Sequence, residues 1–235
     1  VYDIPQVKYI KLEDKVTLGK KRNIMNREAK GEFFVYMDDD DYYPEDRVSH
    51  GVETLLQNPE YLIAGCDKIL LYYGEPENML IQIGPYRKNH ATAATFVFRK
   101  ELLNNQKYDE NKSFGEETSF LNRFTVPLIQ LDGEKTIVVF AHRFNSIDKR
   151  FILNNKKAHK VVELKEELSK YIKNDIYRNF VLTSDNILKE YELGKLEYKK
   201  DIDDELEKKK KINKQNQEKI NNVKDDLEKF NKNEL

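Results

Sequence analysis

Asp38, Asp39, Asp40 and Asp41 form a run of four carboxylates, the stretch of this sequence best suited to chemistry. Neighbouring carboxylates repel one another, and at least one takes up a proton unless a cation lies among them. Hard divalent ions such as Mg²⁺ and Mn²⁺ prefer oxygen ligands of this kind, often together with phosphate oxygens. An isolated aspartate run is more often a solvated acidic loop, so the interpretation depends on what surrounds it.

The segment before the acids favours a metal site. Residues 33–37 are an apolar run with the length and the aromatic and β-branched content of a buried strand, and Gly31 marks its start. Pro44, just after the acids, suits the first turn of a new helix. A strand would therefore deliver the carboxylates to its C-terminal end, where open α/β sheets bind ligands.

The elements that must position this run follow from hydrophobic spacing. Alternating strands and helices predict an α/β fold, a mixed sheet flanked by helices. One helix is expected from residue 18 to a C-cap at Gly31, and another over 44–57; their apolar faces would be Ile24, Met25 and Ala29, and Val48, Val52 and Leu55. Ser113 and Glu116 have the form of a capping box that opens a third. Expected strands cover 7–10, 33–37, 66–73, 79–83, 94–98, 128–131 and 136–141, with 66–73 and 79–83 forming a hairpin.

The character of the chain changes near residue 154. We expect a first domain over 1–153 and a charged helical extension over 154–235. Apolar residues step by four in the first part of the extension and in a coiled-coil pattern in the second: Leu168, Ile172, Ile176 and Phe180, then Ile220, Val223, Leu227 and Phe230. Self-association could use these helices. The lysines at 208–211 are interpreted as a solvated helix face.

Composition excludes several classes of protein. The 235 residues carry a net charge of -1, so no basic field indicates nucleic acid as a partner. Cys66 is the single cysteine, which excludes an internal disulfide and fits a reducing compartment. No apolar stretch approaches the roughly 18 residues of a transmembrane helix, and no signal peptide is visible. Because the chain begins with Val1 rather than Met, missing targeting signals carry little weight.

Four motifs together resemble the family 2 glycosyltransferases of the GT-A fold. They are G-K-K-R-N at 19–23, A-K-G-E-F-F-V-Y-M-D-D-D-D at 29–41, G-E-E at 115–117, and His142 after the last strand. The likeness covers the predicted first domain. The string M-D-D-D-D-Y-Y-P is also similar to members found in large DNA viruses. The first strands of the family pattern are missing, so we expect the chain to be a fragment of a longer protein.

The resemblance implies a role for each matching residue. The D-x-D motif matches Asp38, Asp39 and Asp40, of which Asp38 and Asp39 would contact the nucleotide sugar. Mn²⁺ or Mg²⁺ would be held by Asp38, Asp40 and His142. The nucleotide or its phosphates would be contacted by Lys20, Lys21 and Arg22. Glu117 would be the general base that deprotonates an acceptor hydroxyl, with Glu116 as the alternative carboxylate.

The function implied is metal-dependent transfer of a sugar from a UDP- or GDP-sugar to a hydroxyl of a glycan, protein or lipid, with inversion. Two alternatives remain open: a nucleotidyltransferase that makes sugar nucleotides, although no Gly-rich phosphate loop is visible, and a non-catalytic scaffold that acts through its helical tail. We expect no nucleic-acid partner. The expected location is the cytoplasm, of the host cell if the protein is viral.

Overall fold

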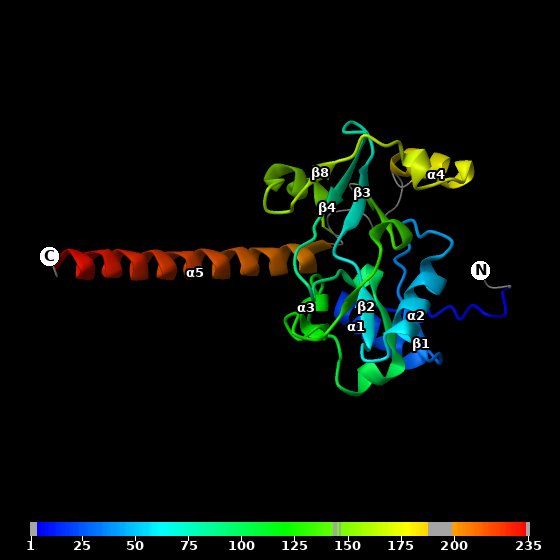
Figure 1. Ribbon diagram of the computed structural model, residues 1–235, viewed down its shortest axis with the longest axis horizontal. Helices are drawn as coiled ribbons and strands as arrows, with labels where there is room; N and C mark the ends of the chain where they lie inside the picture. Colours follow the sequence, from blue (N-terminus) through cyan, green and yellow to red (C-terminus); the bar gives the residue numbers. More distant parts are fainter. Residues whose placement is uncertain (1–3, 143–144, 146, 188–198, 234–235) are drawn as a thin grey trace.

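A computed structural model of the chain describes residues 4–142, 145, 147–187 and 199–233, and the side chains of these residues except 184–187 and 225–233. Its mixed α/β body carries one long helix, α5 (Lys200–Asn233), that projects away from it (Figure 1). The predicted fold class is therefore confirmed. Within the described ranges, no helix combines the length and apolar character needed to cross a bilayer.

Two four-stranded sheets form the body, where the sequence predicts one. The first has the order β1 (Phe33–Val35), β5 (Val97–Arg99), β2 (Ile63–Gly65) and β6 (Ile129–Gln130). The second has the order β7 (Val138–Ala141), β3 (Ile69–Tyr73), β4 (Met79–Ile83) and β8 (Val162–Glu163). β2 pairs with β6, and β3 with β7, in parallel; the other pairs are antiparallel. The predicted hairpin is confirmed as β3 and β4.

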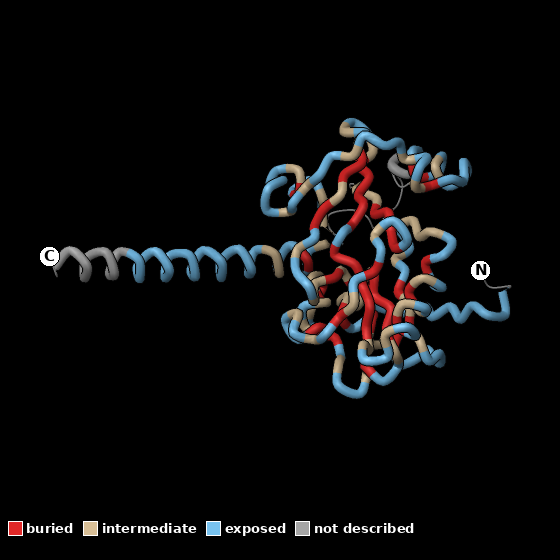
Figure 2. The backbone as a smooth tube through the Cα atoms, in the orientation of Figure 1, coloured by how far each residue is buried: buried red, intermediate tan, exposed pale blue. Residues whose placement is uncertain are grey.

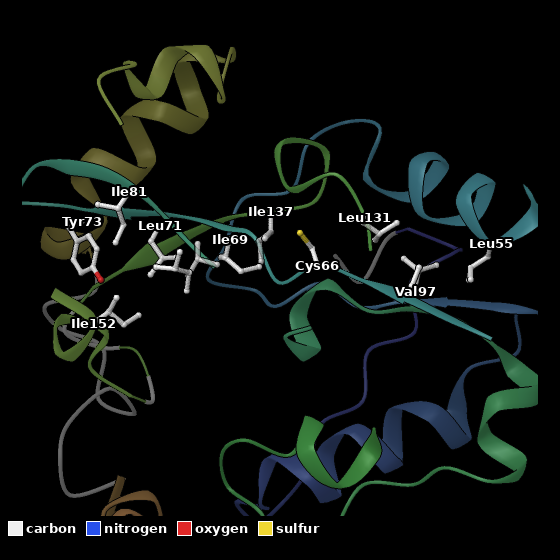
Figure 3. Packing of buried hydrophobic residues seen from close by; sticks show 13 residues of the cluster. Leu55, Cys66, Ile69, Leu71, Tyr73, Ile81, Val97, Leu131, Ile137 and Ile152 are labelled. Atoms are coloured by element: carbon white, nitrogen blue, oxygen red, sulfur yellow. The ribbon is translucent and has the colours of Figure 1, made fainter. Parts of the chain in front are cut away.

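A continuous apolar core joins the two sheets. It runs from Leu55 of α2 (Arg47–Gln57) past Val97 and Cys66 to Leu71 and Tyr73 of β3, all almost completely buried (Figure 3). Figure 2 shows the buried chain following the strands through both halves of the body. The thiol lies in this core, and its burial raises the pKa of Cys66 to about 12, so it is a packing residue at neutral pH.

The first helix turns a polar face inward. α1 (Leu18–Glu28) is capped by Thr17, and its buried residues are Gly19, Arg22 and Asn26. The predicted apolar face and the C-cap at Gly31 are wrong, since Met25 is 40% exposed and the C-cap is Ala29. The reason is tertiary, because buried hydrogen-bond partners for the inward polar groups outweigh apolar periodicity.

Other expectations fail where a segment meets no partner. Residues 7–10 are exposed coil, because no described strand pairs with them. α2 begins at Arg47 rather than at Pro44, and its buried residues are Arg47, Gly51 and Leu55, while Val48 is 48% exposed. β2 and β8 were not expected from the sequence.

The extension packs on the second sheet before it leaves the body. Ile172 is fully buried against that sheet, together with Val181 of α4 (Asp175–Ile187). The predicted helix face with an apolar residue at every fourth position is wrong. Leu168 lies in a separate 3₁₀ turn, and Ile176 and Phe180 are 75% and 57% exposed. The boundary at 153/154 stays a prediction, and so does self-association. α5 is one helix with exposed Ile220 and Val223, and the side chains of Leu227 and Phe230 lie outside the described residues.

A substitution of Gly19 tests the close approach of α1 to the body. A Cβ at this position would lie 2.1 Å from the carbonyl oxygen of Asp109. Gly19→Ala should therefore cost about 1–3 kcal/mol of unfolding free energy in urea, although alanine stabilises an exposed helix by up to about 1 kcal/mol relative to glycine. Lys21→Ala, on the exposed side of α1, should stay within about 0.5 kcal/mol. A stabilised Gly19→Ala protein would contradict the described contact.

Candidate active site

The acid run begins where β1 stops. Tyr36 continues the strand by donating its N–H to the carbonyl oxygen of Phe96 (3.0 Å). The fully buried Arg47 donates Nη2 to the carbonyl oxygens of Tyr36 (3.4 Å) and Phe96 (3.2 Å), which fixes the end of the strand. The hydroxyl of Tyr43 then accepts the N–H of Asp38 at 2.7 Å. The backbone entering the acids is thus held by side chains that follow them in sequence.

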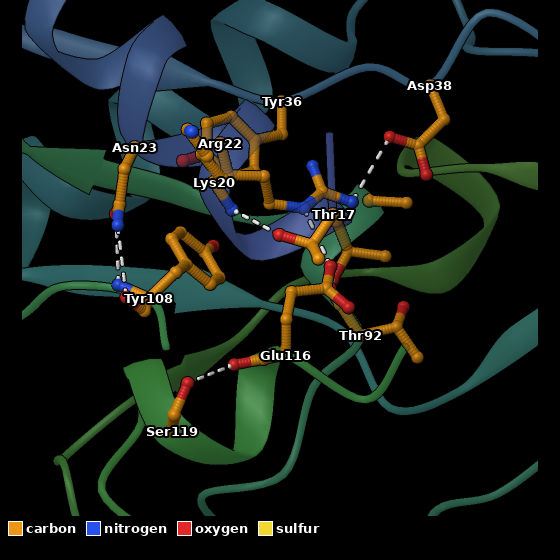
Figure 4. Close-up of polar contacts among 12 residues, drawn as sticks. Thr17, Lys20, Arg22, Asn23, Tyr36, Asp38, Thr92, Tyr108, Glu116 and Ser119 are labelled. Atoms are coloured by element: carbon orange, nitrogen blue, oxygen red, sulfur yellow. Dashed lines mark hydrogen bonds and ion pairs between the residues drawn. The ribbon is translucent and has the colours of Figure 1, made fainter. Parts of the chain in front are cut away.

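Arg22 joins the acid run to the glutamate pair (Figure 4). Its Nε donates to Oε1 of Glu116 at 2.7 Å, and its Nη2 lies 3.4 Å from Oδ1 of Asp38. The guanidinium also lies over the ring of Tyr36, 4.9 Å from its centroid. Burial by itself would lower the pKa of Arg22. The charges of Asp38 and Glu116 raise this pKa by more than burial lowers it, so the side chain stays positively charged.

Glu117 follows directly and is set up differently. It is the first residue of α3 (Glu117–Phe120), and its side chain is partly buried. Burial first, and the neighbouring charge of Glu116 second, raise the pKa of Glu117 to about 7 from its usual 4.5. Glu116 is fixed as the partner of Arg22, so Glu117 is the carboxyl group with the proton affinity of a general base at neutral pH.

Asp40 lies at the other end of the site, with His142 and Asn145. Its Oδ2 is 3.5 Å from Nε2 of His142 and accepts a hydrogen bond from Nδ2 of Asn145 at 3.1 Å. Asn145 also accepts the backbone N–H of His142 at 2.9 Å. Burial opposes ionisation, but the hydrogen bond with His142 and the charge of Lys149 keep the pKa of Asp40 below its usual value. Asp40 is therefore an ionised, accessible carboxylate.

The remaining two acids differ again. Asp41 points inward and accepts the backbone N–H of Phe140 at 3.0 Å. Burial first, and the charge of Asp40 second, raise the pKa of Asp41 to about 8, so it carries a proton at neutral pH. Asp39 is exposed. Burial and the neighbouring carboxylate thus favour the neutral form of Asp41, which lowers the charge of the acid run.

The structure brings together part of the predicted set. Arg22, Asp38 and Glu116 are in contact, and so are Asp40 and His142. Lys20 and Lys21 are exposed on α1, whereas Arg22 is buried. The capping box is wrong: Ser113 donates to Asp201 at 2.7 Å, and Glu116 pairs with Arg22. Sequence reasoning missed Tyr36 and Tyr43, whose only signal is their position on either side of the acids.

Comparison with known proteins decides the family. The profile described as glycosyl transferase family 2 matches residues 2–126, which is more than half of the 235 residues. This chain belongs to glycosyl transferase family 2. The match includes Asp38 to Asp41, Glu116 and Glu117, and it ends before His142. A search of curated proteins found no match.

Among solved structures, the family 2 chain is similar to residues 1–349 of TarS from S. aureus. The sequences are 16% identical, the TM-score is 0.35, and the match covers 72% of this chain and 50% of the TarS chain. The chain thus spans about half the length of that structure. The family assignment rests on the profile match.

A divalent cation fits this family 2 site in part. The exposed carboxylate of Asp40 and the imidazole of His142 are adjacent, but Asp38 is turned toward Arg22. No cluster of three or more His, Cys, Asp or Glu side chains suited to a metal occurs in the described part of the chain. Mg²⁺ and similar ions are often bound by one or two carboxylates together with substrate phosphates and water. Asp40 and His142 would supply the protein's share of such a site.

The Arg22–Glu116 pair can be tested by unfolding. Both side chains are about 95% buried. Arg22→Met should therefore lower the free energy of unfolding measured in urea by about 3–5 kcal/mol, because it leaves Glu116 charged and unpaired. Adding Glu116→Gln should recover part of that loss, since it removes the buried charge. Lys8→Met, which breaks the exposed pair with Glu28, serves as the control and should leave the midpoint unchanged. If Arg22→Met and Lys8→Met change the free energy of unfolding equally, the buried network is ruled out.

Proposed function

We propose that this family 2 chain carries the catalytic site of a metal-dependent, inverting glycosyltransferase, which moves a sugar from a nucleoside diphosphate sugar to an acceptor hydroxyl. The observation that carries the proposal is that Arg22 joins the acid run, through Asp38, to the glutamate pair, through Glu116, and that each of these two segments carries one pole of the site. One pole is the ionised Asp40 beside His142, and the other is Glu117, whose pKa is about 7. Family membership favours sugar transfer over the nucleotidyltransferase alternative.

Glu117 performs the proton step of the proposed reaction. Its carboxylate accepts the proton of the acceptor hydroxyl as that oxygen attacks the anomeric carbon, because a neutral alcohol is a poor nucleophile. The bond from the anomeric carbon to the donor phosphate breaks on the opposite face, so the configuration inverts and a nucleoside diphosphate leaves. A bound Mn²⁺ or Mg²⁺ supplies Lewis-acid neutralisation of the charge on that leaving group.

The other residues hold this geometry. Arg22 binds Asp38 and Glu116, which ties the acid run to the residue next to the proposed base. Asn145 orients Asp40 and His142 toward each other. Lys20, Lys21 and Asp39 are exposed near the site and would contact the nucleotide, as proposed from the motif match. UDP- or GDP-sugar as donor, and a glycan, protein or lipid as acceptor, complete the proposal. The cytoplasmic location stays a prediction.

Binding of metal and nucleotide together tests the first pole. The thermal midpoint should rise by about 5–10 °C when Mn²⁺ and the correct nucleotide, UDP or GDP, are present at about 100 times Kd. Mn²⁺ or nucleotide alone should shift it much less. Asp40→Asn should abolish the joint shift, whereas Glu45→Gln, an exposed acid nearby, should retain it. A joint shift that survives Asp40→Asn would overturn the assignment of Asp40.

Turnover tests the second pole and separates the enzyme from a scaffold. Glu117→Gln should lower kcat about 10²–10⁴-fold with little change in the KM for the donor, and the exposed Glu101→Gln should be silent. Because the base must be ionised, the wild-type rate should rise with pH and level off above about 7. Metal and nucleotide binding without turnover would favour the scaffold.

A stability measurement gives the same titration without a substrate. The folded pKa of Glu117 is raised above its unfolded value of 4.5, so the folded state binds this proton more tightly. The wild-type protein should lose stability relative to Glu117→Gln as pH rises from about 4.5 to about 7. A pH-independent difference between the two proteins would show that Glu117 titrates normally.

A further inference from the structure

The first turns of α5 bind the loop that leads into the catalytic glutamates. Asp201 accepts hydrogen bonds from Nζ of Lys15 at 2.5 Å and from Oγ of Ser113 at 2.7 Å, one on each carboxylate oxygen. Glu205 accepts Nζ of Lys112 at 2.7 Å and the backbone N–H of Ser113 at 3.0 Å, again one on each oxygen. Three of these four hydrogen bonds come from Lys112 and Ser113, about 90 residues earlier in the chain, and the fourth comes from Lys15, 186 residues earlier.

The same loop is fixed on its other side by α1. The N–H of Gly19 donates to the carbonyl oxygen of Lys112 at 2.9 Å, and Oγ1 of Thr17 donates to that of Glu110 at 2.5 Å. Gly115 follows in the left-handed region at φ +61°, and a Cβ built there would meet no atom within 4 Å. Glu116 is fixed by its ion pair with Arg22, and the contacts to Lys112 and Ser113 fix the segment that leads into Gly115, Glu116 and Glu117.

The helix also reaches the other pole of the site. Lys199, next to the start of α5, donates Nζ to the backbone oxygen of Asn145 at 2.8 Å, and Asn145 orients Asp40. Ile202 is buried between these polar contacts, with 6% of its surface exposed. Figure 1 shows the start of α5 beside α3, with the rest of the helix leaving the body. Farther along the helix, Ile212 and Ile220 are about half exposed.

We propose that Asp201 and Glu205 are positioning residues for the base, acting through Lys112 and Ser113. Their carboxylates clamp this segment against α1, so that the turn at Gly115 presents Glu117 to the acceptor. This inference rests on the proposed function of Glu117. It makes the beginning of α5 part of the catalytic unit, although it lies far outside the residues that match the family.

The test is the double variant Asp201→Ala/Glu205→Ala in the full chain. Because small displacements of a reacting group are costly, kcat should fall roughly 10–100-fold with the KM for the donor unchanged. Hydrogen exchange at amides 112–117 should accelerate, most at Ser113. The matched control is Asp204→Ala/Glu207→Ala, which removes the same charge from exposed positions of the same helix and should change neither readout.

The milder double variant Asp201→Asn/Glu205→Gln keeps one carbonyl acceptor on each side chain. It should recover part of kcat and part of the protection of amides 112–117 from hydrogen exchange. The same variant replaces the alanine variant in the test if the alanine variant does not fold. Unchanged exchange at 112–117 would overturn the inference, whatever the activity. Accelerated exchange with an unchanged kcat would overturn the positioning role. The wild-type chain could instead show no turnover while the double alanine variant still exchanges faster than wild type at amides 112–117. That outcome would count against the proposed function and leave the contacts of Asp201 and Glu205 as purely structural ones.

Discussion

One buried cation constrains the rest of this structure. A guanidinium removed from water is tolerated only with charged and hydrogen-bonding partners, and Arg22 finds Glu116, Asp38 and the face of Tyr36. To reach them, α1 must turn its polar side inward, and Gly19 must pass so close to the loop at Asp109 that no side chain fits. The packing of the first helix is thus decided by electrostatics rather than by its apolar residues.

Environment, and not residue type, assigns the acids their different states. Asp40 and Asp41 are adjacent, yet His142 and Lys149 favour the charged form of one while burial and its neighbour favour the neutral form of the other. The glutamate pair divides in the same way, because Glu116 is paired with the arginine, whereas burial and the charge of its neighbour outweigh the other influences on the pKa of Glu117. Two identical side chains side by side can therefore serve as a structural anion and as a base.

The extension connects to this arrangement through polar contacts at its base. Asp201 and Glu205 contact Lys112 and Ser113, while Ile212, Ile220 and Val223 farther along α5 are exposed to solvent. The first turns of α5 are thus held by these charged groups together with the buried Ile202. Because Lys112 and Ser113 lie just before Glu116 and Glu117 in the chain, the proposed positioning role would make the geometry of the site depend on the anchoring of the helix.

The sequence by itself determined what depends on neighbours in the chain. Short-range patterns indicated the strand before the acids, the β3–β4 hairpin, the mixed α/β class, helix in the region of α5, and the motifs of family 2. Tertiary structure alone decided that α1 faces inward with Arg22, that Ser113 bonds to Asp201 rather than capping a helix, and that the strands divide into two sheets. The physical reason is separation. The partner of Arg22 lies 94 residues away, and that of Ser113 lies 88 residues away. Apolar periodicity reports burial but not which distant polar group will satisfy a buried charge.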